Sequence, residues 1–176
     1  EGHDGVLTIL QTTKLTRVQQ FGLGVLSLPI SLAVISVLTF VPTFYAIDLG
    51  FGLTIAGLIF AVGRILDVLT DPIVGHLSDK TRSPFGKRLP WMILGAIIFC
   101  PALYFVMSPP FGGAIFGVVA IVTLFFLSLT LIDLPYSAVG LEISPFSHER
   151  TIIAAVKAVF QIVGAFTASL LIVLFA

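Results

Sequence analysis

The sequence predicts an all-α integral membrane protein with about five transmembrane helices. Of its 176 residues, 57% are hydrophobic and only 10% are charged, and the mean hydropathy is +1.13. These values lie well outside the range of soluble domains, because so few charged side chains cannot cover that much apolar surface. The apolar residues also fall into five runs, each near the length of about 20 residues that a helix needs to cross the hydrocarbon.

The five runs give the expected order of elements. After a leader at 1–17, we expect a transmembrane domain over 18–176, with helices at about 18–47, 53–78, 91–108, 114–139 and 151–176. The first run has no charged residue. Several prolines fall inside the runs, which helices in lipid tolerate better than soluble helices do. One of them, Pro135, weakens the fourth helix just after Asp133.

Basic residues in the connecting segments predict the orientation. They precede the first helix and follow the second and fourth helices, at Lys14, Arg17, Lys80, Arg82, Lys87, Arg88 and Arg150. Loops rich in Lys and Arg stay in the cytoplasm. The N-terminus is therefore expected on the cytoplasmic side of the cell (inner) membrane.

Other functional classes find little support in the sequence. Nine basic and nine acidic residues balance, so net charge does not indicate nucleic-acid binding. Cys100 is the single cysteine, which excludes an intrachain disulfide and a cysteine metal cluster. We find no nucleophile–base set and no phosphate loop, so we expect neither an enzyme nor a cofactor. The chain does not start with Met and stops inside an apolar run, so we expect it to be part of a longer chain.

The second helix carries three charged residues on one stripe. Asp67 and Asp71 lie one turn apart, about 40° around the helix, and Arg64 lies within about 60° of both. Each charge costs roughly 2.5–3.5 kcal/mol at the bilayer centre, so the stripe must face protein or a water-filled cavity. Repulsion between the carboxylates is relieved by a proton, by a hard cation or by Arg64. The alternative is a static Arg64–Asp67 ion pair, with Asp71 capping backbone near Pro72.

The fourth and fifth helices each add one charge. Asp133 lies one turn after Thr130, whose hydroxyl is a further candidate oxygen ligand. Lys157 lies about two turns into the fifth helix. It either pairs with Asp133 or extends along the helix to the inner surface.

An ordered set of motifs identifies a resemblance. The stretch from Gly75 to Trp91 resembles the loop between helices two and three of the major facilitator superfamily. More narrowly, the chain resembles the glycoside–pentoside–hexuronide:cation symporter family. Four further segments agree, at 45–50, 63–67, 70–75 and 133–138, the last followed by Glu142 and Glu149-Arg150-Thr151. The match covers helices one to five of an N-terminal six-helix half.

The resemblance implies roles for individual residues. It implies a cation site, for H⁺ or for Na⁺, at Asp67, Thr70, Asp71 and Thr130, without any other metal. Asp133 and Lys157 match substrate-contacting positions, and Ser137 stands where a sugar permease of the family has a stacking tryptophan. A charge network that gates the transporter is implied at Arg64, Asp79, Lys80, Arg82, Lys87 and Arg88; in the loop, the alternative is that the cations only fix orientation.

The predicted function is therefore cation-coupled secondary transport of a small solute, a sugar or glycoside, by the longer parent chain. Helix one lacks the sugar-binding acid of a family sugar permease, so a lipid or other non-sugar solute is an alternative. A further alternative is a membrane assembly or partner protein that keeps the fold without transporting. Thr70 replaces an asparagine of sodium-using relatives, which favours H⁺ as the coupling ion, with Na⁺ left open. The expected partners are the solute, the bilayer and a C-terminal half on the same or a companion chain.

Overall fold

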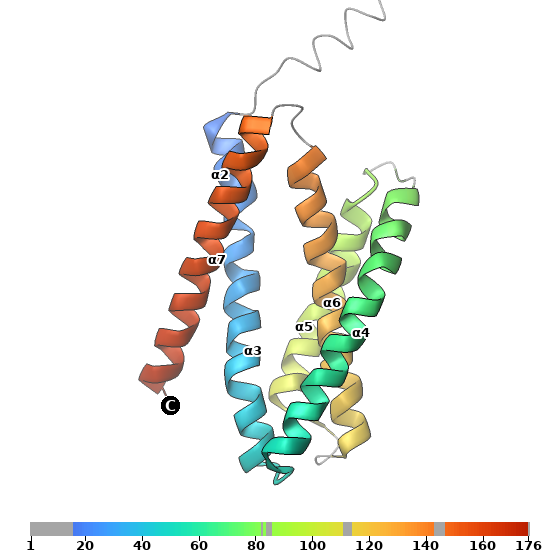
Figure 1. The fold of residues 1–176 in the computed structure, drawn as a ribbon, viewed down its shortest axis with the longest axis vertical. Helices are drawn as coiled ribbons and strands as arrows, with labels where there is room; N and C mark the ends of the chain where they lie inside the picture. The colour runs from blue at the N-terminus through green and yellow to red at the C-terminus, as the bar shows by residue number, and fades with distance from the viewer. Residues whose placement is uncertain (1–15, 82, 84–85, 111–113, 143–146, 176) are drawn as a thin grey trace, which may run out of the picture.

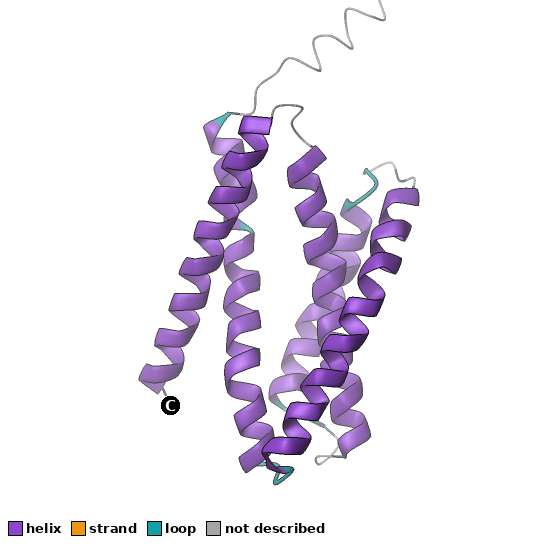
Figure 2. Ribbon diagram, viewed as in Figure 1, coloured by secondary structure: helices purple, strands orange, loops and turns teal. Residues whose placement is uncertain are grey.

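The described part of the chain is helical throughout, and five of its spans are long and apolar enough to cross a membrane. The structure, a computed structural model, describes residues 16–81, 83, 86–110, 114–142 and 147–175. The helices are α2 (Arg17–Val25), α3 (Ser27–Ile47), α4 (Gly52–Lys80), α5 (Leu89–Met107), α6 (Ile115–Glu142) and α7 (Ser147–Phe175) (Figures 1 and 2). The predicted all-α membrane fold is confirmed. Of the predicted leader, positions 1–15 lie outside the described residues.

The first span differs from the single helix predicted at 18–47, because it divides at Leu26 into α2 and α3. Pro29 explains the division: proline has no N–H to donate, and its ring clashes with the carbonyl four residues earlier, that of Val25. The hydroxyl of Ser27 donates to the carbonyl oxygen of Gly24 at 2.6 Å, which satisfies one of the backbone groups at the break.

The fourth helix, predicted at about 114–139, corresponds to α6, which continues through Pro135 and ends at Glu142. The Pro135 side chain is fully buried by its neighbours. Neighbouring helices that enclose a proline hold its helix together even where one backbone hydrogen bond is missing. Asp133 therefore lies on a continuous helix.

The helices form two groups (Figure 1). In one group α2 and α3 pack along α7, and in the other α4 and α5 pack on α6. The groups meet mainly where α3 contacts α4, with smaller contacts of α3 with α5 and of α6 with α7. The α3–α7 contact is close at Gly164, where an added Cβ would lie 2.8 Å from the carbonyl oxygen of Leu28, so only glycine fits there.

An apolar core fastens the two groups together at one end. It joins α3, α4, α5 and α6 through buried residues that include Val41, Ile59, Val106 and Phe125. Tyr45 is fully buried, and its hydroxyl donates to the carbonyl oxygen of Val106 at 2.8 Å. We call the opposite end, where α2 begins and α4 ends, the basic end, because Arg17, Lys80, Lys87 and Arg88 lie there.

Candidate functional site

A cavity of about 590 Å³ lies between the two helix groups. Four helices line it: α3, α4, α6 and α7. Its charged lining residues are Arg64, Asp67 and Asp71 from α4 and Asp133 from α6. The structure thus brings four of the five predicted intramembrane charges to one cavity, and the fifth, Lys157, reaches it by binding Asp133.

Thr130 joins the two carboxylates of α4. Its hydroxyl oxygen lies 3.1 Å from Oδ1 of Asp71 and also makes a short hydrogen bond with Oδ1 of Asp67. Asp67 is buried, with 8% of its surface exposed, and Thr130 is buried as well. One hydroxyl carries one proton and can donate it to only one carboxylate. The second contact is favourable when the other carboxyl group is protonated and donates to the Thr130 oxygen.

Arg64 neutralises one carboxylate of the pair. Its Nη1 lies 3.0 Å from Oδ2 of Asp67, and its guanidinium carbon lies 5.6 Å from the centre of the Phe126 ring. This is the ion pair that the static alternative requires. Asp71, however, contacts Thr130 in the cavity, whereas that alternative places it on the backbone near Pro72. Both oxygens of Asp67 are engaged, so Asp71 is the freer of the two carboxylates.

Thr70 has a different position from the one that the resemblance implies. Its hydroxyl donates to the backbone carbonyl oxygen of Asp67 at 2.9 Å, and Thr70 is not among the residues that line the cavity. A threonine inside a helix often bonds to the carbonyl of the preceding turn. The oxygens that face the cavity at this point therefore come from Asp67, Asp71 and Thr130.

Asp133 and Lys157 form a second polar group in the same region. Nζ of Lys157 lies 3.0 Å from Oδ1 of Asp133 and 2.6 Å from Oγ of Ser137. It also lies 4.6 Å from the centre of the Tyr136 ring, in cation–π geometry. Of the two positions considered for Lys157, the structure has the one paired with Asp133. Ser137 thus contacts the amine that the resemblance assigns to the substrate.

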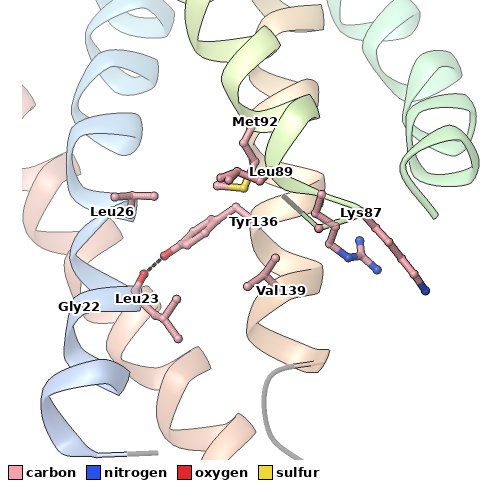
Figure 3. Close-up of a pocket in the computed structure, with 10 residues that line it drawn as sticks. Gly22, Leu23, Leu26, Lys87, Leu89, Met92, Tyr136 and Val139 are labelled. Carbon is pink, nitrogen blue, oxygen red and sulfur yellow. Dashed lines mark hydrogen bonds between the residues drawn. The ribbon is translucent and has the colours of Figure 1, made fainter. Parts of the chain in front are cut away.

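Tyr136 connects this group to the break in the first span. Its hydroxyl donates to the carbonyl oxygen of Leu23 on α2 (Figure 3). Ser27 lies beside it, with its hydroxyl 3.1 Å from the carbonyl oxygen of Lys157. Tyr136 also lines a second cavity of about 540 Å³, together with Leu89 and Met92 of α5. These hydrogen bonds connect the first span with α6 and α7 next to Lys157.

Four of the predicted gating residues, Asp79, Lys80, Lys87 and Arg88, lie at the basic end, whereas Arg64 lines the cavity. Nη2 of Arg88 lies 3.0 Å from Oδ1 of Asp79, which links the end of α4 to the start of α5. Nε1 of Trp91 donates to Oγ1 of Thr81 at 2.8 Å beside this pair. Lys80 and Lys87 are exposed. Arg82 lies outside the described residues.

Two polar residues of the cavity were missed by the sequence reasoning. Gln161 of α7 and Ser31 of α3 both line it. Gln161 follows Lys157 by four residues, so it lies one turn further along the same face of α7. A search for polar residues at helical spacing from Lys157 would have found it. Ser31 gives no such signal, because its helix carries no charged residue from which to count. In the structure its hydroxyl donates to the Leu28 carbonyl oxygen of the same helix at 3.0 Å.

Comparison with known proteins finds similar transporters. An uncharacterised symporter of Synechocystis is 35% identical over 153 residues, which are 80% of this chain and 28% of the relative. A lactose permease of Leuconostoc lactis is 31% identical over 61% of the chain and 17% of the relative. A sodium-dependent lysophosphatidylcholine symporter of Danio rerio is 31% identical over 62% of the chain and 21% of the relative. The chain thus spans less than a third of the length of these relatives.

The family model described as "MFS/sugar transport protein" matches residues 21–176, nearly the whole of the sequence. The relatives' names are those of transporters, as expected from the absence of enzyme motifs in the sequence. The resemblance to cation symporters of the major facilitator superfamily is confirmed. The chain belongs to the MFS/sugar transport protein family.

Proposed function

We propose that the protein containing this chain is a cation-coupled secondary transporter of a sugar or glycoside. It is an integral protein of the cell (inner) membrane, with its N-terminus in the cytoplasm. The observation that carries the proposal is a carboxylate pair bridged by Thr130 in the same cavity as Asp133, which is paired with Lys157. A coupled transporter needs such a pair of neighbouring sites, one for the cation and one for the solute.

The cation site comprises Asp67, Asp71 and Thr130. We propose H⁺ as the coupling ion. Small hard cations prefer about six or more oxygen ligands, as Mg²⁺ and Ca²⁺ do. Asp67 already binds Thr130 and Arg64, and the Thr70 hydroxyl is bonded to backbone, which leaves few free oxygens for Na⁺. A proton needs one carboxylate oxygen and one acceptor, and Asp71 with Thr130 supplies both.

The solute site comprises Asp133, Ser137 and Lys157. A carboxylate accepts hydrogen bonds from the hydroxyl groups of a sugar, and a lysine amine donates to their oxygens. Hydrogen bonds to charged groups contribute about 1.5–3 kcal/mol each, so two of them give useful affinity even after the sugar loses its hydration. The charged pair also holds its side chains in place before the solute arrives.

Coupling follows from the shared cavity. In a medium of low dielectric, the charge at Asp71 alters the potential at Asp133 and Lys157 across the cavity. Binding of a proton at Asp71 therefore changes the affinity of the solute site, and by linkage the solute changes the affinity for the proton by the same factor. The remaining part of the parent protein supplies the other half of the transporter.

The test is uptake of labelled sugars and glycosides by the full-length protein in proteoliposomes. One set of vesicles has a pH gradient alone, and another has a sodium gradient alone at fixed pH. We expect accumulation with the pH gradient and its loss in Asp71→Asn, while Asp48→Asn at the opposite end of the bundle stays coupled. Accumulation that follows only sodium would replace H⁺ by Na⁺ as the coupling ion. Indifference to both gradients, with Asp71→Asn also silent, would refute coupled transport.

A further inference from the structure

The walls of the cavity differ in polarity. Its α4 wall consists of Arg64, Asp67 and Asp71 alone. The facing helices α3 and α7 contribute mainly aliphatic residues: Ile30, Val34, Ile35, Ala158, Ile162 and Ala165. Each of these two helices adds one neutral polar side chain, Ser31 and Gln161 respectively. A solute in this cavity therefore meets a charged wall on one side and an aliphatic wall on the other.

The described cavity lining contains no aromatic side chain. Tyr136, the aromatic residue next to Asp133 and Lys157, lines the second cavity and has the Lys157 amine over its ring. The side chain beside it on α6, Ser137, is small and bonded to that amine. The apolar surface that this part of the chain offers to a solute is therefore aliphatic and lies mainly on α3 and α7, with Leu129 and Leu134 of α6.

The charges of the site favour an uncharged solute. Three carboxylates, Asp67, Asp71 and Asp133, face two cations, Arg64 and Lys157. One coupling cation brings this group to neutrality. A solute with a net charge would then be left without a counter-charge in a low-dielectric cavity, which is costly.

We propose that the solute is an uncharged glycoside with an apolar aglycone. This inference rests on the proposed function and adds the substrate class. The sugar hydroxyls bind Asp133 and the Gln161 amide, both of which line the cavity. The aglycone lies against the aliphatic wall near Ile35 and Ile162. The cavity volume falls within the range of about 300–1,000 Å³ that is typical of sites for drug-sized ligands, which leaves room for both parts.

The experiment measures competition for cation-driven uptake by the full-length protein in proteoliposomes. The labelled solute is a methyl glycoside, and the competitors are the methyl, butyl and hexyl glycosides of the same sugar, tested for both glucose and galactose. Burial of each methylene against an aliphatic wall should improve the inhibition constant by about fourfold until the wall is covered. Butanol and hexanol at equal concentration control for effects of the alkyl chain on the bilayer.

A pair of variants on α7 locates the effect. Ile162→Ser removes an aliphatic side chain from the cavity wall and should reduce the hexyl-to-methyl ratio of inhibition severalfold. Val163→Ser makes the same kind of change at the next position, which does not line the cavity, and should leave the ratio unchanged.

The outcomes separate the two proposals. Cation-driven uptake with equal inhibition by all chain lengths, or an unchanged ratio in Ile162→Ser, would overturn the aglycone inference and leave the proposed function standing. Absence of cation-driven uptake for every sugar and glycoside would overturn both.

Discussion

The hydroxyl of Thr130 lies 3.1 Å from Oδ1 of Asp71, across the boundary between α6 and α4. The same hydroxyl contacts Asp67, so a single neutral side chain joins two carboxylates that would otherwise repel each other. Because the bridge connects two helices, the state of the carboxylates and the contact between α4 and α6 depend on one another. The four predictions below concern polar contacts that lie between this bridge and the basic end.

Loss of the Thr130 hydroxyl should weaken the cation site. In Thr130→Val, the two carboxylates lose their shared partner while the side-chain volume is kept. Hydrogen bonds to charged groups contribute about 1.5–3 kcal/mol, so we expect the apparent affinity for the coupling ion to fall about 10- to 150-fold. Thr130→Ser keeps the hydroxyl and should retain most of the affinity. The measurement is initial uptake rate against concentration of the coupling ion.

Thr123 provides a matched control on the same helix. Its hydroxyl oxygen is buried and has no hydrogen-bond partner among the described residues. Thr123→Val therefore makes the same chemical change without breaking a contact, and should leave ion affinity unchanged. Equal losses in Thr123→Val and Thr130→Val would show that the effect is one of helix packing.

The positive charge of Lys157 should be needed for solute affinity. Lys157→Met removes the partner of Asp133 and should weaken solute binding by at least about tenfold, since one hydrogen bond to a charged group is worth about 1.5–3 kcal/mol. Lys157→Arg keeps a cation within reach of Asp133 and should bind the solute far better than the Met variant. The readout is solute binding to the purified full-length protein at saturating coupling ion.

The double variant Asp133→Asn/Lys157→Met separates stability from binding. It removes both charges of the pair, so no unpaired carboxylate is left at position 133. Expression and thermal stability should recover relative to Lys157→Met, while solute affinity should stay low. Recovery of affinity in the double variant would argue that the pair is only structural.

The Tyr136 hydroxyl should stabilise the divided first span. Tyr136→Phe removes the hydrogen bond to the Leu23 carbonyl and keeps the ring beneath Lys157. The expected loss is about 1 kcal/mol of stability, the usual contribution of one hydrogen bond, with little change in solute affinity. Tyr136→Leu removes the ring too and should also weaken solute binding. Thermal unfolding in detergent and solute titration report the two effects separately.

Tyr104 is the appropriate comparison for that experiment. It lies on α5 with 66% of its surface exposed, so Tyr104→Phe should change neither stability nor affinity. If Tyr136→Phe were as stable as the parent protein, the contact with Leu23 would be unimportant for the fold.

The ion pair between Asp79 and Arg88 should affect turnover more than stability. The Asp79 side chain is 63% exposed, and an exposed ion pair contributes no more than about 1 kcal/mol. We expect Asp79→Asn and Arg88→Gln to insert normally and to transport severalfold more slowly at saturating solute. Arg17→Gln, at an exposed basic residue of the same end that is outside the predicted network, is the control for charge alone. Unchanged rates in all three variants would leave the basic residues with only a role in orientation.

The sequence alone determined which segments cross the membrane and which charges share a helix face. Composition and run length suffice for the first, because any long apolar run needs the bilayer as its solvent. Helical periodicity suffices for the second, because residues three and four positions apart share a helix face, as Arg64, Asp67 and Asp71 do. Asp133 and Lys157 also stand out as charges inside apolar runs, with Thr130 one turn before Asp133, and the family resemblance added roles for them; these three lie at or beside the cavity.

Other features depended on contacts between helices, which no local pattern encodes. The bridging position of Thr130 and the lining position of Gln161 follow from how α6 and α7 are rotated about their axes, and packing of whole helix faces sets that rotation. The resemblance implies a place for Thr70 in the cation site, whereas in the structure its hydroxyl donates to a backbone carbonyl of its own helix. Pro29 and Pro135 both lie inside an apolar run that is predicted to be one helix. Only the first lies at a break in its span, because the second is enclosed by neighbouring helices that hold α6 continuous.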